Sequence, residues 1–407
     1  MSWEIITPGA WPKPPREMSV STLRAIESCP RRWALSTASY PDLWPGIGYP
    51  PRIRRRRLMG SVVHLAIERI VRRLAQANCG SLSDPCGPSA IRELGGFTSI
   101  VQSCIEDTVA RHANNPRLPD GQELRITLER HMSQMRVAVQ SMLRTVPLVS
   151  TKGPREYFGR RLRRGPLGPG TYPELEVRAP ELHWKGFVDL LALGPDGTCK
   201  IHDFKTGARS DDHEFQIRVC SVLWSADNDL NPTGSLPSKL TISYPSGEVA
   251  IPVPTREEAE AIRADLHQRA TIASELAKAH PPEARPSVDK CKLCEVRQLC
   301  SVYWQADTQR RLAAEADRSP SLGDLEVRVM SRRGPVTWDA RVRQSDRLKY
   351  GEPVVLLAHG GDRRIEVGRI LRILDARVLN ATEEQSDVHP DIPVASLTSI
   401  SEVHWVS

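Results

Sequence analysis

A predicted β-hairpin constrains the fold of this chain more than any other feature of its sequence. Its first segment, residues 186–193, reads Gly-Phe-Val-Asp-Leu-Leu-Ala-Leu, and its second, residues 200–205, reads Lys-Ile-His-Asp-Phe-Lys. A Pro-Asp-Gly turn lies between them. If the turn is centred on Asp196, Asp189 lies directly opposite Asp203 on one face of the hairpin. Carboxylates that face each other across two strands repel, so the hairpin predicts a positive partner for both.

A divalent cation is the simplest partner, because Mg²⁺ and Mn²⁺ prefer carboxylate oxygens. Strand residues two apart share a face, so Lys205 projects beside Asp203. An ammonium group there can position a water molecule and stabilise the charge that develops on a phosphate. We therefore take Asp189, Asp203 and Lys205 as candidate catalytic residues for phosphodiester hydrolysis. The competing interpretation is an ordinary ion pair between Asp203 and Lys205 at a sheet margin.

The rest of the sequence predicts an α/β fold with a helical amino-terminal segment, a mixed sheet flanked by helices, and a small carboxy-terminal β-barrel-like domain of OB or SH3 type. We expect an irregular lead-in over residues 1–18 and a main domain over 19–316. The main domain would contain a helical insertion at 59–150 and a cysteine segment at 291–300. The small β-rich domain would follow at 322–407.

Apolar periodicity and turn residues give the expected elements. Helices are expected over 21–29, 59–77, 89–113, 122–145, 211–226 and 255–280. Strands are expected over 174–178, 183–193, 198–204, 325–330, 336–342, 353–358 and 365–373, with a hairpin over 238–253. Residues 38–58 are expected to be a loop.

The formal net charge is +7, and arginines are bunched at 52–57 and at 160–164. These runs are either solvated loops or contacts to a polyanion such as DNA. No apolar stretch approaches the length of a membrane span, and the first residues lack the basic-then-apolar order of a secretory signal. We therefore expect a cytoplasmic protein that does not contact a membrane.

Three cysteines form a Cys-x2-Cys-x5-Cys segment at Cys291, Cys294 and Cys300, and a fourth ligand would come from Cys29. Four thiolates can hold either zinc or an iron–sulfur cluster, and this spacing alone does not choose between them. The other cysteines have no motif around them and are expected to be small apolar fillers. They are Cys79, Cys86, Cys104, Cys199 and Cys220.

The hairpin, with His-Asp-Phe-Lys-Thr-Gly at residues 202–207, resembles the core of the RecB-like PD-(D/E)XK nucleases. In that family the two acids bind metal and the lysine is catalytic. The segment from Ser21 to Trp33 is similar to its amino-terminal signature, and Gly-Ser-Val-Val-His64 is similar to the helix whose histidine is a further metal ligand. Gln216 matches the glutamine of the family's Q-x-x-x-Y motif, but position 220 is cysteine instead of tyrosine.

The resemblance extends over about residues 19–304 and implies two further groups. An acidic residue ahead of Asp189 is common in the family, and we choose Glu176, with Glu174 or Glu181 as alternatives. The cysteine arrangement is similar to the 4Fe-4S cluster of the AddB nuclease domain and of the CRISPR-associated adaptation nuclease. This similarity favours a 4Fe-4S cluster over zinc, with four ligands: Cys29, Cys291, Cys294 and Cys300.

The implied function is a Mg²⁺- or Mn²⁺-dependent deoxyribonuclease, with His64, Asp189 and Asp203 as metal ligands. We expect an exonuclease on single-stranded or frayed DNA that acts in DNA repair, recombination or anti-phage defence. The chain lacks a phosphate-loop motif, so unwinding would need a helicase partner, which the carboxy-terminal β domain could recruit. The alternatives are a catalytically silent DNA-binding scaffold and a zinc-stabilised adaptor.

Overall fold

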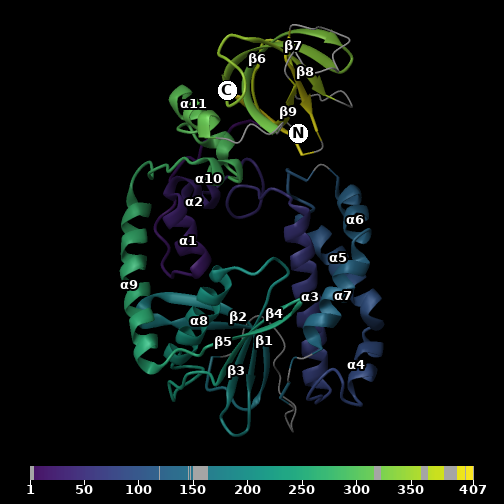
Figure 1. Cartoon of the computed structure of the whole chain (residues 1–407), viewed down its shortest axis with the longest axis vertical. Helices are drawn as coiled ribbons and strands as arrows, with labels where there is room; N and C mark the ends of the chain where they lie inside the picture. Colours follow the sequence, from purple (N-terminus) through teal and green to yellow (C-terminus); the bar gives the residue numbers. More distant parts are fainter. Residues whose placement is uncertain are drawn as a thin grey trace. The chain divides into compact units, whose positions relative to one another are not determined.

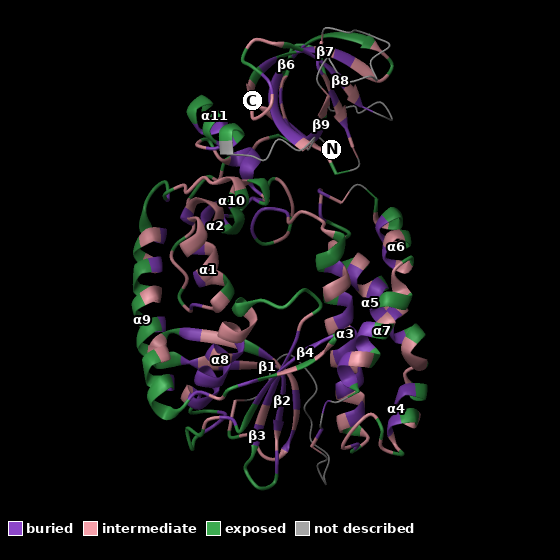
Figure 2. Cartoon of the chain, viewed as in Figure 1, coloured by how far each residue is buried: buried purple, intermediate pink, exposed green. Residues whose placement is uncertain are grey.

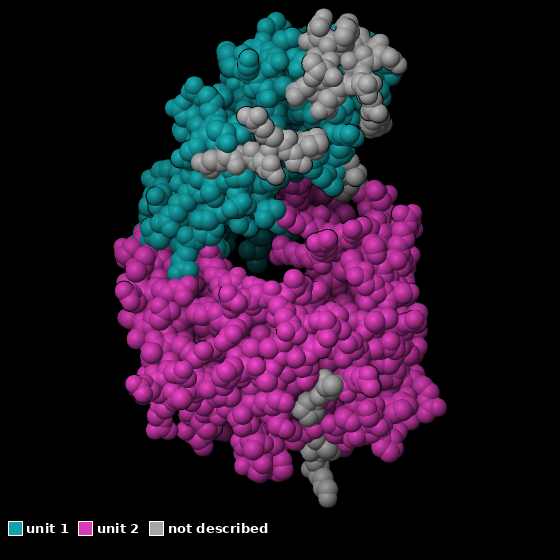
Figure 3. Space-filling model, viewed as in Figure 1, with its two compact units in different colours: residues 1–13, 25–51, 276–407 teal, residues 14–24, 52–275 magenta. Residues whose placement is uncertain are grey.

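The computed structural model describes residues 4–118, 120–144, 146, 148–149, 164–315, 322–358, 365–379, 392–398 and 400–406. These residues form two compact units, which Figure 3 distinguishes by colour. Unit 1 comprises residues 1–13, 25–51 and 276–407, and unit 2 comprises residues 14–24 and 52–275. The cysteine segment thus belongs to the same unit as the carboxy-terminal β domain.

Unit 2 is built on a five-stranded mixed sheet in the order β1-β2-β3-β4-β5 (Figure 1). Strands β3 and β4 are parallel and the other neighbours are antiparallel. A parallel pair needs a crossover connection, which helix α8 (Asp211–Ala226) provides. The strands are β1 (Gly170–Ala179), β2 (Trp184–Leu193), β3 (Cys199–Phe204), β4 (Lys239–Tyr244) and β5 (Gly247–Ile251). The predicted mixed sheet is confirmed.

The β2–β3 hairpin has the register that a turn centred on Asp196 requires, because Leu193 pairs with Cys199. The Asp196 carboxylate accepts hydrogen bonds from the backbone N–H and the hydroxyl of Thr198, at 3.1 Å and 2.7 Å. Gly197 has a φ of +80°, which a glycine adopts without steric cost. The Pro-Asp-Gly sequence therefore fixes the register of the strands that carry the candidate site.

Helices α3 to α7 gather beside the sheet around one apolar core (Figure 1). Leu190 of β2 and Phe204 of β3 belong to this core. The α3 residues in contact with the core are buried, and the residues between them are more exposed (Figure 2). The helices are α3 (Arg55–Gln76), α4 (Gly87–Glu93), α5 (Gly96–His112), α6 (Gly121–Glu129) and α7 (Met132–Leu143).

Two of the long helices expected in this region are each divided into two. Helix α4 ends before Gly95 and Gly96, which both have a φ of +84°. A residue with a positive φ ends an α-helix, so the helix that follows can begin in a different direction. Helix α3 also begins at Arg55 instead of residue 59, so part of the first arginine run is helical. In the second run, Arg160, Arg161 and Arg163 lie outside the described residues.

Unit 1 contains a small β-barrel, as expected. Strand β10 pairs with both β8 and β9, which closes the ring β10-β8-β7-β6-β9, and β11 extends it beside β9. Alternate residues of each strand fill its apolar core. The strands are β6 (Leu322–Gly334), β7 (Thr337–Ser345), β8 (Pro353–Ala358), β9 (Ile370–Leu379), β10 (Val394–Leu397) and β11 (Glu402–Val406).

The described residues form five more α-helices besides α3 to α8. They are α1 (Val20–Ser28), α2 (Pro30–Thr37), α9 (Arg256–Lys278), α10 (Val288–Lys292) and α11 (Ala306–Glu315). Thr255 caps α9, since its hydroxyl accepts a hydrogen bond from the Glu258 N–H and its own N–H donates to the Glu258 carboxylate. Within the described residues, no helix is both long and apolar enough to cross a membrane.

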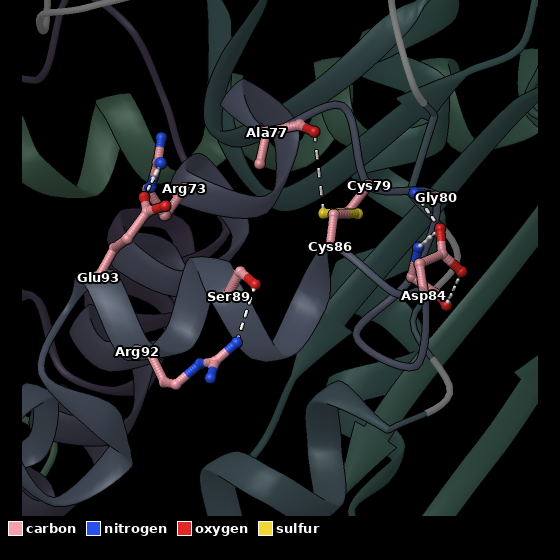
Figure 4. Close-up of a disulfide and its surroundings, with 10 residues drawn as sticks. Arg73, Ala77, Cys79, Gly80, Asp84, Cys86, Ser89, Arg92 and Glu93 are labelled. Carbon is pink, nitrogen blue, oxygen red and sulfur yellow. Dashed lines mark hydrogen bonds and ion pairs between the residues drawn. A yellow bond between two sulfur atoms is a disulfide. The ribbon is translucent and has the colours of Figure 1, made fainter.

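Two cysteines expected to be isolated fillers are joined instead. Cys79 and Cys86 form a disulfide that closes the short loop between α3 and α4 (Figure 4). Within that loop the Asp84 carboxylate accepts backbone hydrogen bonds from Gly80 and Ser81, at 2.6 Å and 3.1 Å. This turn brings the two cysteine Cα atoms to 5.9 Å, within the range a disulfide spans. The filler interpretation was wrong for this pair.

Candidate active site

Asp189 and Asp203 occupy neighbouring positions on β2 and β3. The last paired rung of the hairpin is Leu190 with His202, so the two aspartates lie one position beyond it. There the Asp189 carboxylate accepts a hydrogen bond from the Phe204 backbone N–H at 2.7 Å. Asp203 is only 4% exposed. The hairpin therefore brings two carboxylates together in a largely buried place.

A third carboxylate comes from β1, and it belongs to Glu174. In the continuous register of β1 with β2, Glu174 falls opposite Asp189. Glu176, the residue chosen from the sequence, instead forms an ion pair with Arg178 at 2.7 Å. The structure thus favours the alternative Glu174 over Glu176, and the exposed Glu181 lies outside the strand. The sequence could not make this choice, because it does not specify how β1 pairs with β2.

His64 of α3 completes this group. Its Nδ1 lies 3.7 Å from Oδ2 of Asp189, and one donor atom each from His64, Glu174 and Asp189 all lie within 4.8 Å of one another. The carboxylate oxygens are donors that suit Mg²⁺ or Mn²⁺, and the imidazole nitrogen is a donor that suits transition-metal ions. The expected ligand set named Asp203 in place of Glu174. These residues therefore fit a divalent cation, with Glu174 as an added ligand.

The raised pKa values of the three acids indicate that nearby positive charge does not balance their negative charge. Burial raises the pKa of Glu174 to about 7, and the nearby charge of Asp189 adds to the effect. Burial, followed by the charge of Asp189, raises the pKa of Asp203 to about 6. Burial also raises the pKa of Asp189. A cation bound among these residues would offset the repulsion that their ionised forms experience.

Lys205 follows directly after β3 and contacts Asp203. Its Nζ lies 2.9 Å and 2.7 Å from the two oxygens of that carboxylate. Burial lowers the pKa of Lys205, but the charges of Asp203 and Asp189 outweigh this and raise it overall. The side chain is therefore an ammonium ion beside the acids, as the hairpin predicts.

Helix α8 covers the site with the residues of the altered motif. Cys220 is buried, and its thiol lies 3.6 Å from the Phe187 carbonyl oxygen. Burial, with Asp203 as the next cause, raises its pKa to about 12, so the thiol is neutral. Gln216 is half-buried one turn earlier on the same side of α8. The structure thus places position 220 near the acids, where the motif would have a tyrosine.

Three residues near Lys205 were not found from the sequence: Arg209, His213 and Tyr244. The Tyr244 hydroxyl lies 2.9 Å from Nδ1 of His213, and the Arg209 guanidinium lies 5.6 Å from the Tyr244 ring centroid. One available signal was the spacing of His213, which lies one turn before Gln216 on α8. No such sequence signal exists for Tyr244, since it ends a strand that is distant in sequence from Lys205.

The four candidate cluster cysteines all belong to unit 1, whereas the residues of the candidate active site belong to unit 2. Cys29, Cys291, Cys294 and Cys300 line one pocket, and none forms a disulfide. The Arg285 backbone N–H donates to the Cys29 sulfur at 3.5 Å. Burial raises the pKa of Cys291, Cys294 and Cys300, with that of Cys294 at about 12.

Comparison with known proteins agrees with this geometry. The model of a family described as the PD-(D/E)XK nuclease superfamily matches residues 17–301. The chain therefore belongs to the PD-(D/E)XK nuclease superfamily. No curated protein matches the chain.

One solved structure shows a distant likeness to part of the chain. The chain is 18% identical to the protein of the "Crystal structure of SSO0001", with a TM-score of 0.21. The match covers 32% of this chain and 60% of the other, so the chain spans less than two thirds of that protein's length.

Proposed function

We propose that the protein is a Mg²⁺- or Mn²⁺-dependent deoxyribonuclease whose catalytic centre is formed by His64, Glu174, Asp189, Asp203 and Lys205. The observation that carries the proposal is the convergence of three carboxylates, an imidazole and an ammonium group in one partly buried place. His64, Glu174 and Asp189 would hold the ion, with Asp203 beside them. When bound, the ion would supply Lewis-acid activation of the phosphate.

The protein's own groups have separable tasks in this proposal. Asp203 holds the Lys205 ammonium in place through both carboxylate oxygens. Lys205 can then orient the attacking water molecule and stabilise negative charge on the scissile phosphate. Gln216, on the helix that covers the site, would position the DNA. Catalysis would depend mainly on positioning and charge, as is usual for phosphoryl chemistry.

We further propose that the substrate is single-stranded or frayed DNA and that cleavage starts from an end. The resemblance to the RecB-like nucleases is what supports this choice of substrate. The exposed arginines of the first turn of α3 could contact the DNA backbone. By resemblance, the pathway would be DNA repair, recombination or anti-phage defence, with a helicase as partner that the β-barrel would recruit.

Cleavage assays test the catalytic part of this proposal. End-labelled linear and circular single strands and a blunt duplex would be incubated with Mg²⁺ or Mn²⁺, for the wild type and for Asp203→Ala and Lys205→Ala. Asp265→Asn, an exposed substitution on α9, is the control. We expect the wild type and the control to degrade linear single strands, and the two active-site variants not to. Equal degradation by all four proteins would contradict the assignment, and cleavage of circles would contradict the requirement for an end.

For the four cysteines we propose a 4Fe-4S cluster with a structural role. The four cysteines line one pocket without forming a disulfide, which supports a shared metal group. Arg31, Arg32 and Arg285, which line the same pocket, suit the negative charge of a cluster held by four thiolates.

Chemical analysis separates the two kinds of metal. We expect anaerobically purified protein to contain about four iron and four sulfide per chain and to absorb visible light. A Cys294→Ser variant should lose both the iron and the absorbance, whereas Cys104→Ser, a buried cysteine outside the pocket, should keep them. Stoichiometric zinc without iron would contradict the cluster.

A further inference from the structure

Tyr244 is the immediate neighbour of Lys205 in the sheet. Strands β3 and β4 are parallel, and their last pair is Phe204 with Ser243. The Lys205 backbone N–H then donates to the Ser243 carbonyl oxygen at 2.9 Å, which extends the pairing by one step. Tyr244 follows Ser243 and is therefore level with Lys205. Since β4 and β2 lie on opposite sides of β3, Tyr244 lies on the side of Lys205 away from Asp189.

Two cationic or polar side chains hold the Tyr244 ring. Nδ1 of His213 lies 2.9 Å from the Tyr244 hydroxyl, and the two rings are tilted with centroids 5.8 Å apart. The Arg209 guanidinium lies over the ring, 5.6 Å from its centroid. The ring itself is 4% exposed, as buried as Asp203. The hydroxyl is thus fixed beside the candidate catalytic lysine.

These residues differ in charge from the metal-binding side of the site. On the side of β1 and β2 the groups are carboxylates, whereas on the side of β4 they are Lys205, Arg209, His213 and Tyr244. The first turn of α8 also carries acids, which lie at Asp211, Asp212 and Glu214. Asp212 forms an ion pair with Arg24 at 2.9 Å, and Glu214 lies 3.8 Å from Arg218. Two of the three acids are therefore partnered.

We propose that Tyr244 and Arg209 bind a backbone phosphate of the DNA next to the scissile one, with His213 as the residue that positions Tyr244. This inference rests on the proposed nuclease function. A DNA strand carries regularly spaced phosphates, so a strand with one phosphate at Lys205 presents the next one nearby. Arg209 supplies a permanent positive charge, and the tyrosine hydroxyl supplies a directed hydrogen bond.

His213 determines which way the hydroxyl hydrogen points. If Nδ1 of His213 carries its hydrogen, it donates to the Tyr244 oxygen, and the hydroxyl hydrogen is then available to a phosphate oxygen. Ser210 holds His213 in place, because the Ser210 hydroxyl and carbonyl accept hydrogen bonds from the backbone N–H groups of Asp212 and His213. In this chain the site's aromatic hydroxyl therefore comes from β4, while position 220 on α8 is a thiol.

Steady-state cleavage of a short single-stranded DNA in Mn²⁺ tests the inference. Tyr244→Phe removes only the hydroxyl, and Tyr172→Phe, a strand tyrosine whose hydroxyl donates to Gly168, is the matched control. We expect KM to rise about tenfold for Tyr244→Phe, the scale of one hydrogen bond to a charged group, with kcat within about twofold of the wild type. Arg209→Gln, an exposed substitution that should not affect folding, should also raise KM.

Two variants of His213 separate positioning from packing. Asparagine places an amide donor close to where Nδ1 lies in histidine, so His213→Asn should keep KM within about threefold of the wild type. His213→Leu fills similar space without a donor and should match Tyr244→Phe. Equal KM values for His213→Asn and His213→Leu would overturn the positioning role.

A chemically altered substrate tests the contact itself. A DNA with one neutral methylphosphonate at the linkage next to the cleaved one should weaken binding by the wild type about tenfold. It should weaken binding by Tyr244→Phe less, because that variant has already lost the hydroxyl's hydrogen bond and keeps only the Arg209 part of the contact. Equal weakening for both proteins at each neighbouring linkage would overturn the proposal, as would a Tyr244→Phe variant with the KM of Tyr172→Phe.

Failure of this inference can be distinguished from failure of the proposed function. Binding of the same DNA is measured by fluorescence anisotropy, which requires no cleavage. A wild type that binds but never cleaves would contradict the nuclease proposal, while the Tyr244 and methylphosphonate comparison would still decide the phosphate contact. A wild type that cleaves while Tyr244→Phe and Arg209→Gln behave like the wild type would contradict only this inference.

Discussion

Two buried clusters of charge in this protein are built in opposite ways. In unit 1, Arg297 is 2% exposed and forms ion pairs with Asp324 at 2.6 Å and Asp375 at 2.9 Å. The Tyr303 hydroxyl donates to Asp324 at 2.7 Å. Burial would raise the pKa of Asp324, but the Arg297 guanidinium outweighs it and holds that pKa below its ordinary value. Both acids that contact Arg297 are therefore paired with a cation, whereas the neighbouring Asp346, which accepts a hydrogen bond from the Asp324 backbone N–H at 2.9 Å, has its pKa raised to about 7 by burial and by the charge of Asp324.

In unit 2, the three carboxylates near His64 share a single ammonium group. Lys205 contacts Asp203, while the pKa values of Glu174 and Asp203 rise to about 7 and 6, chiefly through burial. In the first cluster Arg297 is paired with both acids that it contacts, and these ion pairs connect the cysteine segment to strands β6 and β9. The second has an excess of negative charge. The comparison teaches that buried charge supports structure where it is paired, and indicates binding of a cation where it is not.

The largest expected effect is on activity at the unpaired cluster. Asp189→Asn keeps the side-chain shape and an oxygen that can accept the Phe204 hydrogen bond. It removes one charged ligand, so we expect nuclease activity to fall at least about a thousandfold, roughly 4 kcal/mol of transition-state stabilisation. The free energy of unfolding without metal should stay equal or increase, because a repelling buried charge is gone. A large loss of stability would break the comparison.

The paired cluster should respond in the opposite way. Asp324→Ala leaves Arg297 with only Asp375 as a charged partner, so we expect the free energy of unfolding of unit 1 to fall by about 3 kcal/mol. Asp307→Ala, which removes an exposed acid paired with Arg310, should have no measurable effect. Chemical denaturation followed by tryptophan fluorescence gives both values, since Trp304 lies beside the cluster segment. An unchanged Asp324→Ala protein would show that the pairing contributes little.

Much of this fold follows from local sequence. The strand β8 and helix α8 have the predicted bounds, and the Pro-Asp-Gly turn gives the β2–β3 register because its geometry is decided within five residues. Strands β10 and β11 were not foreseen. They are short and complete the barrel through pairing with strands β8 and β9, a long-range choice that a local pattern does not record.

The candidate site shows the same difference between features that local sequence decides and features that long-range pairing decides. The facing of Asp189 and Asp203 and the nearness of Lys205 depend on one hairpin and were predicted. Glu174 depends on how β1 pairs with β2, and Tyr244 on how β4 pairs with β3, so neither could be chosen from the sequence. His64 was named only through family resemblance, because the contact of α3 with β2 has no local signature.

Metal binding distinguishes Glu174 from its neighbour on β1. With Mn²⁺ at about 100 times its dissociation constant, we expect the wild type to gain about 2.7 kcal/mol in the free energy of unfolding. Glu174→Gln should lose most of this gain, because a ligand charge is absent. Glu176→Gln, which disrupts only the ion pair with Arg178, should keep it. The reverse result, measured by thermal unfolding with and without Mn²⁺, would restore the choice made from the sequence.

The smallest expected effect is the pH dependence of the metal-free protein. The pKa of Glu174 in the folded protein is about 7, above its ordinary value near 4.3. A group of this kind favours the folded state at low pH and loses that contribution as the pH rises through 7, since the unfolded chain ionises more easily. Glu174→Gln removes this dependence. We therefore expect the variant to match the wild type near pH 4 and to exceed it by about 1–2 kcal/mol at pH 8, measured by urea denaturation in a chelator. If the difference between the two proteins does not change with pH, the Glu174 carboxylate is already balanced by a neighbouring cation, and the two charge clusters are alike.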